Sequence, residues 1–182
     1  MDLEYILSTA ERIRILEHIL FKTDPFNVTK IASELGLSKG LVSKFLSILV
    51  GQKVLVRARL RYQIRPGPNV KALRIMFNIK KIDPQMFKKY RTVQSVGAYG
   101  SKVKGSDVEG SDLDLYIIVD RSDDLEQSRL SRDLRQRYGN VKPLYLTKEK
   151  VRQLKRDNEV FYYSLAFGSI TVYGDGIEAV SV

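Results

Sequence analysis

Two pairs of polar residues, separated by ten positions, are able to do chemistry together. Gly100 and Ser101 follow an apolar stretch, and Asp112 and Asp114 open a second apolar run that reaches Val119. A glycine turn that leads into a helix presents the first N–H groups of that helix to an anion. Alternate residues of a strand share a face, so the two carboxylates project together, roughly 6 to 7 Å apart along the strand. These residues predict a site where Mg²⁺ and a phosphate chain meet.

The order of these features resembles the minimal nucleotidyltransferase domains of the polymerase-beta superfamily. A strand, Gly-Ser, a helix, a charged glycine-rich loop and the Asp-x-Asp strand follow one another, and the resemblance covers about half of the chain. It implies an α+β protein whose C-terminal domain has an α/β nucleotidyltransferase fold with a small mixed sheet. Because Gly, Ser and Asp also cluster in ordinary turns, a surface loop between two core strands is the alternative interpretation.

The resemblance also implies roles for individual residues. The expected nucleotide-binding residues are Gly100, Ser101, Lys102 and Ser111. Asp112 and Asp114 are expected to be catalytic and to bind the metal, Mg²⁺ or Mn²⁺. The substrate is expected to be an NTP, with ATP as the first choice. The domain would then transfer a nucleoside monophosphate to a hydroxyl acceptor.

One acidic residue that the family usually carries is missing. Its expected place is the strand at 141–147, but no Asp or Glu occurs between Asp133 and Glu149. Lys142 or Leu144 most nearly takes that place. A Lys ammonium beside two carboxylates can stand where the charge of a metal ion would otherwise be.

This substitution leads to a specific expectation about the site. Lys142 is expected to pair with Asp112 or Asp114, and the protein is expected to bind NTP with weak or absent transfer. The alternative is that Glu149, or an acidic residue of a partner chain, supplies the missing carboxylate.

The resemblance suggests possible partners as well. Stand-alone minimal nucleotidyltransferases often act as antitoxins that transfer AMP to a tyrosine of a HEPN toxin. The resemblance therefore implies a HEPN-type partner and a protein acceptor, and the alternative acceptor is an RNA. A second hypothesis is a transcription regulator whose nucleotidyltransferase domain binds a nucleotide or a partner without efficient catalysis.

The positive charge of the chain is unevenly distributed. The net charge is +10, and residues 1–90 hold 17 Lys and Arg against 7 Asp and Glu, whereas the remaining residues hold 14 of each. Such asymmetry is typical of a nucleic-acid contact in the basic half. A solvated basic face is the alternative.

Residues 28–49, with the segment that follows them, resemble a winged helix-turn-helix. Gly36 permits the turn between two amphipathic helices, and Ser38 can cap the second helix. The run at 54–64 alternates enough for a short hairpin whose three Arg side chains are expected on one face. The expected duplex-DNA contacts are Ser38, Lys39, Gly40, Ser43, Lys44, Arg57, Arg59 and Arg61. The alternative is a module for protein contacts or homodimer formation.

These patterns predict a winged helix-turn-helix at 1–65, linker helices at 66–90 and a nucleotidyltransferase domain at 91–182. Within the first domain, apolar spacing predicts one continuous helix over 4–21. The chain has no Cys, no signal-like N-terminus and no apolar run of membrane-spanning length, so we expect a cytoplasmic protein.

Overall fold

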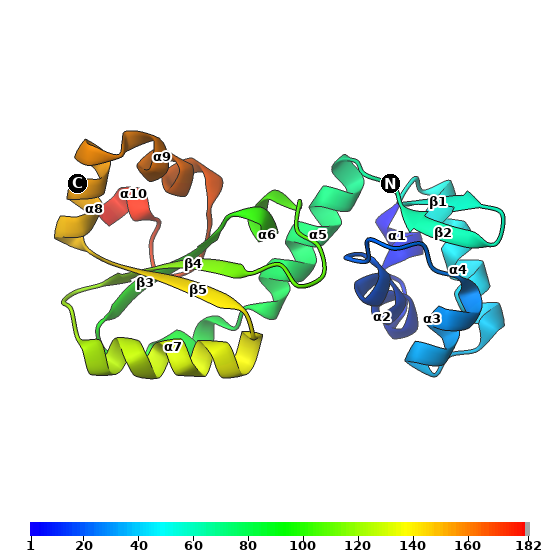
Figure 1. Ribbon diagram of the computed structural model, residues 1–182, viewed down its shortest axis with the longest axis horizontal. Coiled ribbons are helices and arrows are strands. Elements are labelled where there is room, and N and C mark those ends of the chain that lie inside the picture. Colours follow the sequence, from blue (N-terminus) through cyan, green and yellow to red (C-terminus); the bar gives the residue numbers. More distant parts are fainter. Residues whose placement is uncertain (181–182) are drawn as a thin grey trace. The chain divides into compact units, whose positions relative to one another are not determined.

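The computed structural model describes residues 1–180, and the chain forms two compact units (Figure 1). The first unit comprises Met1–Phe77 together with Asp107–Glu109, and the second comprises Asn78–Ser106 together with Gly110–Val182. Each unit has its own hydrophobic core. No helix within residues 1–180 is long and apolar enough to cross a membrane.

The first unit is mainly helical and contains one β-hairpin. Its elements are α1 (Leu3–Ile6), α2 (Ala10–Ile19), α3 (Val28–Leu35), α4 (Lys39–Gly51), β1 (Leu55–Ala58), β2 (Arg61–Ile64) and the greater part of α5 (Pro68–Lys81). Helices α3 and α4 are joined by a tight turn at Gly36, whose φ of +65° suits glycine. The strands β1 and β2 pair antiparallel directly after α4.

The continuous helix expected over 4–21 is wrong, because the chain breaks into α1 and α2. Thr9 has an extended backbone and its hydroxyl accepts a hydrogen bond from the Arg12 N–H, so it caps a new helix instead of continuing the first. Apolar spacing alone did not reveal this break, since Ile6 and Leu16 enter the same core from both helices.

The second unit is built on a four-stranded sheet. Its elements are η1 (Pro84–Lys89), β3 (Val93–Tyr99), α6 (Ser101–Lys104), β4 (Leu113–Val119), α7 (Asp124–Tyr138), β5 (Val141–Thr147), α8 (Lys148–Asp157), α9 (Glu159–Gly168), β6 (Ile170–Tyr173) and α10 (Ile177–Val180). The strand order is β5-β4-β3-β6. Strand β3 is antiparallel to β4 and β6, whereas β4 and β5 are parallel and joined through α7. The expected α+β class with a small mixed sheet is confirmed.

Both faces of this sheet are covered by helices (Figure 1). Leu115 and Ile117 of β4 pack on one face with Leu130 and Leu134 of α7. The alternate residues Tyr116 and Ile118 pack on the other face with α8, α9 and α10. Asp112 and Asp114 continue this second series, so the alternation of the strand assigns both carboxylates to the α8–α10 side of the sheet.

Residues 66–90, expected as linker helices, contribute to both units. Val70, Leu73 and Phe77 of α5 belong to the core of the first unit. Ile82 and Phe87 belong to the core of the second. This segment is therefore packed structure along most of its length.

Candidate functional site

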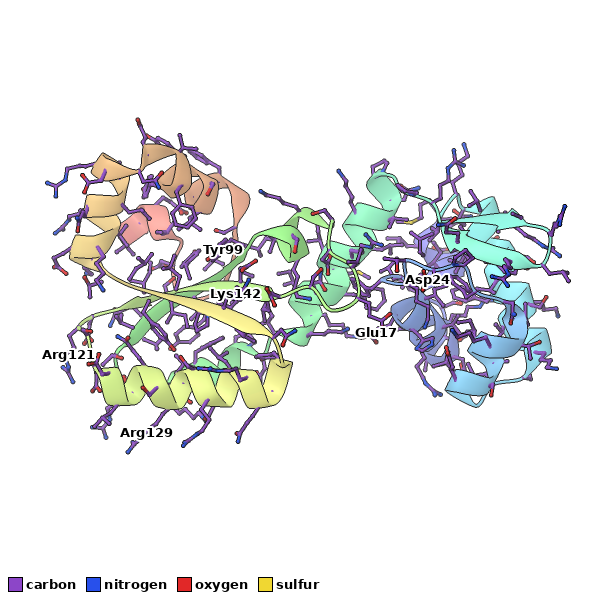
Figure 2. The ribbon with its side chains drawn as sticks, viewed as in Figure 1. Glu17, Asp24, Tyr99, Arg121, Arg129 and Lys142 are labelled. Carbon is purple, nitrogen blue, oxygen red and sulfur yellow. The ribbon has the colours of Figure 1, made fainter. Side chains whose placement is uncertain are left out.

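Three side chains form a row across the sheet at the start of β4. Tyr99 of β3 is paired with Asp114 of β4, and Asp114 is paired with Lys142 of β5. Directly paired residues on neighbouring strands place their side chains on the same face. Tyr99 and Lys142, labelled in Figure 2, therefore flank the Asp114 carboxylate from its two neighbouring strands.

The expected ion pair of Lys142 with Asp112 or Asp114 is confirmed, and its partner is Asp112. The Lys142 Nζ lies 2.6 Å from Oδ2 of Asp112. This hydrogen bond, with the charges of Asp112 and Asp114, raises the pKa of the Lys142 ammonium above its ordinary value. Lys142 thus stays protonated at neutral pH and places a positive charge beside both carboxylates.

Asp114 is partly buried at the start of β4. Burial raises the pKa of Asp114, and the positive charge of Lys142 opposes that shift. The charge of Lys102 acts in the same direction as Lys142, so the expected nucleotide-binding residue Lys102 contributes positive potential at this carboxylate. Burial likewise raises the pKa of the neighbouring Tyr99, which therefore remains a neutral phenol at physiological pH.

Gly100 brings the backbone close to Asp114. Its φ is +79°, and a Cβ added at this position would lie 2.4 Å from Oδ2 of Asp114. No side chain caps the start of α6, which follows directly at Ser101. Helix α6 is a single turn, closed by Gly105 in the left-handed conformation. The Gly-Ser pair and the two carboxylates therefore form one compact site.

Asn78 supports this site and was missed by sequence reasoning. It is buried, and its side-chain Nδ2 donates to the Lys102 carbonyl oxygen at 3.0 Å. This bond fixes the second residue of the α6 turn. Its only signal in the sequence was its polar side chain within the apolar pattern of residues 70–79. Many helices contain such a residue, so this signal did not predict a role.

Glu149 does not replace the missing third carboxylate. Because β5 is parallel to β4, Lys142 lies at the end of the sheet that carries Asp114, and Glu149 follows the opposite end. The strand from Lys142 to Thr147 alone spans roughly 16 Å. Glu149 is exposed in the first turn of α8, where hydrogen bonds at the helix start lower its pKa. The suggestion that Glu149 fills the gap is therefore wrong.

The donor set fits a metal ion only in part. Within residues 1–180 no group of three or more His, Cys, Asp or Glu residues is placed to hold a metal. Asp112 and Asp114 supply carboxylate oxygens of the kind that Mg²⁺ prefers, and such an ion takes its remaining ligands from water and substrate phosphates. The two carboxylates thus fit one ion that binds together with a nucleotide. The Lys142 ammonium neutralises part of the carboxylate charge that a second ion would need.

The family assignment follows from the same segment. The family described as "Polymerase beta, Nucleotidyltransferase" matches residues 80–175, which contain the whole site and sheet. The chain belongs to this family. A search of curated proteins finds no match to the chain.

In this member of the nucleotidyltransferase family, the strand register identifies which residue of β5 lies beside Asp112 and Asp114. Lys142 is aligned with Asp114, whereas Leu144 is aligned with Tyr116 and packs against the apolar core on that face. Of the two residues that were expected to take the place of the third carboxylate, Lys142 is therefore the one at the site.

The residues expected to contact DNA lie on two elements of the first unit. Lys39, Gly40 and Lys44 are exposed on α4, whereas Ser43 is half-buried. The Ser38 hydroxyl accepts a hydrogen bond from the Leu41 N–H at 3.3 Å, so it caps α4. The residues exposed near the N-terminal end of α4 are thus either small or basic.

The expected single face for the three Arg residues of the hairpin is wrong. Arg57 is paired with Tyr62, and its guanidinium lies over that ring, whereas Arg61 is paired with Ala58. These are successive pairs, which face opposite sides of a hairpin. The chain reverses at Arg59, whose φ is +55°, so counting alternation along one continuous strand gave the wrong side for Arg61. All three side chains remain exposed.

The close approach at Gly100 leads to a prediction. Gly100→Ala is expected to abolish most NTP binding in a titration, because the new Cβ displaces the Asp114 carboxylate. Ser101→Ala should cost only about 1 kcal/mol, since it removes one hydrogen bond and leaves the backbone donors. Gly110→Ala is the matched control, because Gly110 also has a positive φ but no atom near its added Cβ. Equal losses at Gly100 and Gly110 would contradict the steric argument.

Proposed function

We propose that this chain is a DNA-binding nucleotidyltransferase, with the N-terminal unit acting as a winged helix-turn-helix and the second unit binding an NTP. The observation that carries the proposal for the second unit is the convergence of Gly100 with the Asp112 and Asp114 carboxylates on one face of the sheet. The family match to residues 80–175 supports nucleotidyl transfer as the general chemistry.

Each residue of the site has a distinct task in this proposal. Gly100 and Ser101 bind the triphosphate through the backbone and the Ser101 hydroxyl, and Lys102 adds positive charge. Asp112 and Asp114 would hold Mg²⁺ or Mn²⁺. The bound ion would neutralise phosphate charge and polarise the α-phosphate. Asn78 keeps the α6 turn in place through its bond to the Lys102 carbonyl.

The reaction supported by this arrangement is an in-line displacement. An acceptor hydroxyl oxygen forms a bond to the α-phosphorus and releases its proton to water, and the bond to the departing pyrophosphate breaks. ATP is the proposed donor. The acceptor is a hydroxyl of a protein or an RNA, and a HEPN-type protein is one proposed partner, as in the antitoxins that the domain resembles.

Lys142 favours a second candidate function. Its ammonium already pairs with Asp112, so the chain binds nucleotide without the full charge arrangement for rapid transfer. In this case the protein is a transcription regulator, or an antitoxin-like regulator, that senses a nucleotide or a partner. The two functions differ in turnover and share the same binding site.

One experiment separates the two. The full chain is incubated with Mg²⁺ and ATP labelled at the α-phosphate, alone and with cell extract or total RNA. Label on the protein, a partner or an RNA supports the transferase. Binding of ATP in a titration without any transferred label supports the regulator, and absence of NTP binding contradicts both.

The N-terminal unit leads to a prediction about salt. Full-length protein is expected to bind duplex DNA with an affinity that falls steeply with salt, because Lys and Arg release counterions from phosphates. Replacing Lys39, Lys44, Arg57 and Arg59 with Ala should reduce the slope of log K against log salt by about 3 to 4. A control with four exposed residues of α7 replaced, Arg129, Arg132, Arg137 and Gln136, should leave the slope unchanged. Absence of binding at low salt would identify the unit as a protein-contact module.

A further inference from the structure

Helix α9 exposes an apolar stripe that the nucleotide site does not use. Val160, Tyr163 and Phe167 are spaced so that they lie along one side of the helix. Val160 is 84% exposed and Phe167 is 83% exposed, although the opposite side of the helix, with Tyr162 and Leu165, is buried. Single exposed apolar side chains are ordinary on protein surfaces, whereas a group of them on one helix side can mark an interaction site.

The two aromatic residues of the stripe form a flat platform. The rings of Tyr163 and Phe167 are stacked, with centroids 5.6 Å apart and planes within 7° of each other. Tyr163 is also held edge-on by Tyr162, at 5.3 Å between ring centroids. The platform is therefore oriented before any ligand binds, and its outer ring, Phe167, has an open face for another planar group.

The neighbouring helix supplies a complementary charge. Helix α8 carries five Lys and Arg residues against two acids within Lys148–Asp157, and all of these side chains are exposed. Lys155 links the two helices, because its Nζ lies 5.5 Å from the centre of the Tyr162 ring. Helices α8 and α9 pack against each other, so the basic helix adjoins the helix that carries the aromatic platform. This combination matches a polymer with negative phosphates and planar bases.

We propose that the surface formed by α8 and α9 binds single-stranded nucleic acid, with a base stacked on Phe167 and the phosphates along α8. Duplex bases are already stacked on one another, so a single strand is the form whose bases can reach the platform. A protein partner is the alternative that the experiments below test, because aromatic residues and Arg are enriched at protein interfaces whereas Lys is depleted from them. The proposal depends on neither nucleotide transfer nor duplex binding by the N-terminal unit.

The position of α9 places this surface on the side of the sheet that carries the Asp pair. Phe161 of α9 packs against Tyr99, which immediately precedes Gly100, with ring centroids 6.3 Å apart. Helix α9 also packs on the same face of the sheet as Tyr116, two residues beyond Asp114. A strand bound at α8 and α9 therefore lies on the face that holds the nucleotide site.

A unique fluorophore tests the proposal directly. The chain has no Trp, so Phe167→Trp reports on this position alone. Full-length Phe167→Trp is titrated in EDTA with 12-residue oligo(dT) and oligo(U), and base stacking is expected to quench the fluorescence with either strand. Leu125→Trp is the matched control, because Leu125 is 75% exposed on α7 of the same unit, and its fluorescence should not change. No quenching of the Phe167→Trp variant up to about 100 µM oligonucleotide, the weak limit of non-specific binding, would overturn the proposal.

A second measurement uses the natural aromatic residue. Phe167→Ala should weaken binding of a labelled oligonucleotide about 5- to 150-fold in anisotropy titrations, while Leu125→Ala leaves it unchanged. Both sites are exposed, so neither change should unfold the protein. Unchanged oligonucleotide affinity in Phe167→Ala would overturn the proposal. The proposal would also be wrong if the unmodified chain formed a dimer that Phe167→Ala dissociated without loss of oligonucleotide binding, because a second copy would then cover the stripe.

Discussion

Lys142→Asp is expected to increase metal-dependent nucleotidyl transfer by at least about tenfold, which corresponds to ~1.4 kcal/mol of added transition-state stabilisation. The change removes the ammonium that pairs with Asp112 and adds a carboxylate in register with Asp114. Three carboxylates can hold a second metal ion, whereas two carboxylates paired with a Lys fit only one. Transfer of label from ATP measures the gain.

Two further variants make this result specific. Lys142→Ala removes the ion pair without adding a ligand, so it should give less transfer than Lys142→Asp. Leu144→Asp adds a carboxylate that is aligned with Tyr116 and the apolar core, and it should destabilise the fold without raising transfer.

Mg²⁺ should also raise the melting temperature of Lys142→Asp more than that of the unmodified chain, because a ligand that binds the folded state stabilises it. Strong transfer in the unmodified chain, or no gain in Lys142→Asp despite intact NTP binding, would contradict the role given to Lys142.

Asp112→Ala and Asp114→Ala are each expected to weaken Mg²⁺-dependent NTP binding by at least about 10- to 100-fold. Loss of an outer-shell partner of a metal site already costs that much, and these carboxylates are the proposed direct ligands. The melting temperature should change by only a few degrees, because both side chains are partly exposed at the sheet end. Calorimetric titration with ATP, with and without Mg²⁺, measures the loss.

Asp120→Ala is the matched control for these variants. Asp120 follows the other end of β4 and is exposed, so its removal deletes the same charge from the same strand away from the site. Its ATP affinity should remain that of the unmodified chain. If Asp112→Ala and Asp114→Ala both bound Mg²⁺ and ATP as Asp120→Ala does, the proposed metal ligands would be wrong.

Features that depend on neighbouring residues could be predicted from the sequence. The apolar run after Asp112 predicted β4, and its alternation predicted that Asp112 and Asp114 share a face, because strand periodicity is local. The turn at Gly36 and the cap at Ser38 were recognised for the same reason. The Lys142 pair was anticipated from a missing acid on the next strand, and the parallel β4–β5 pairing brings it to Asp112.

Features that depend on pairing across the chain were decided only by the tertiary structure. The sequence could not show that Glu149 lies at the far end of the sheet, because that depends on β5 running parallel to β4. Its alternation predicted the wrong face for Arg61, because the hairpin reverses at Arg59. Gly97 is a further case, since an added Cβ would lie 2.2 Å from the Tyr116 ring that crosses it from β4.

The sequence by itself thus determined the family chemistry of this protein: a phosphate turn, two carboxylates on one strand and the absence of the third, with Lys142 or Leu144 in its place. The tertiary structure alone decided which groups meet, namely Gly100 with Asp114, Asn78 with the Lys102 carbonyl, and an exposed Phe167 on a helix beside basic α8. The physical reason is that side-chain periodicity is set within a few residues, whereas strand register and helix packing are set by the burial of residues distant in sequence.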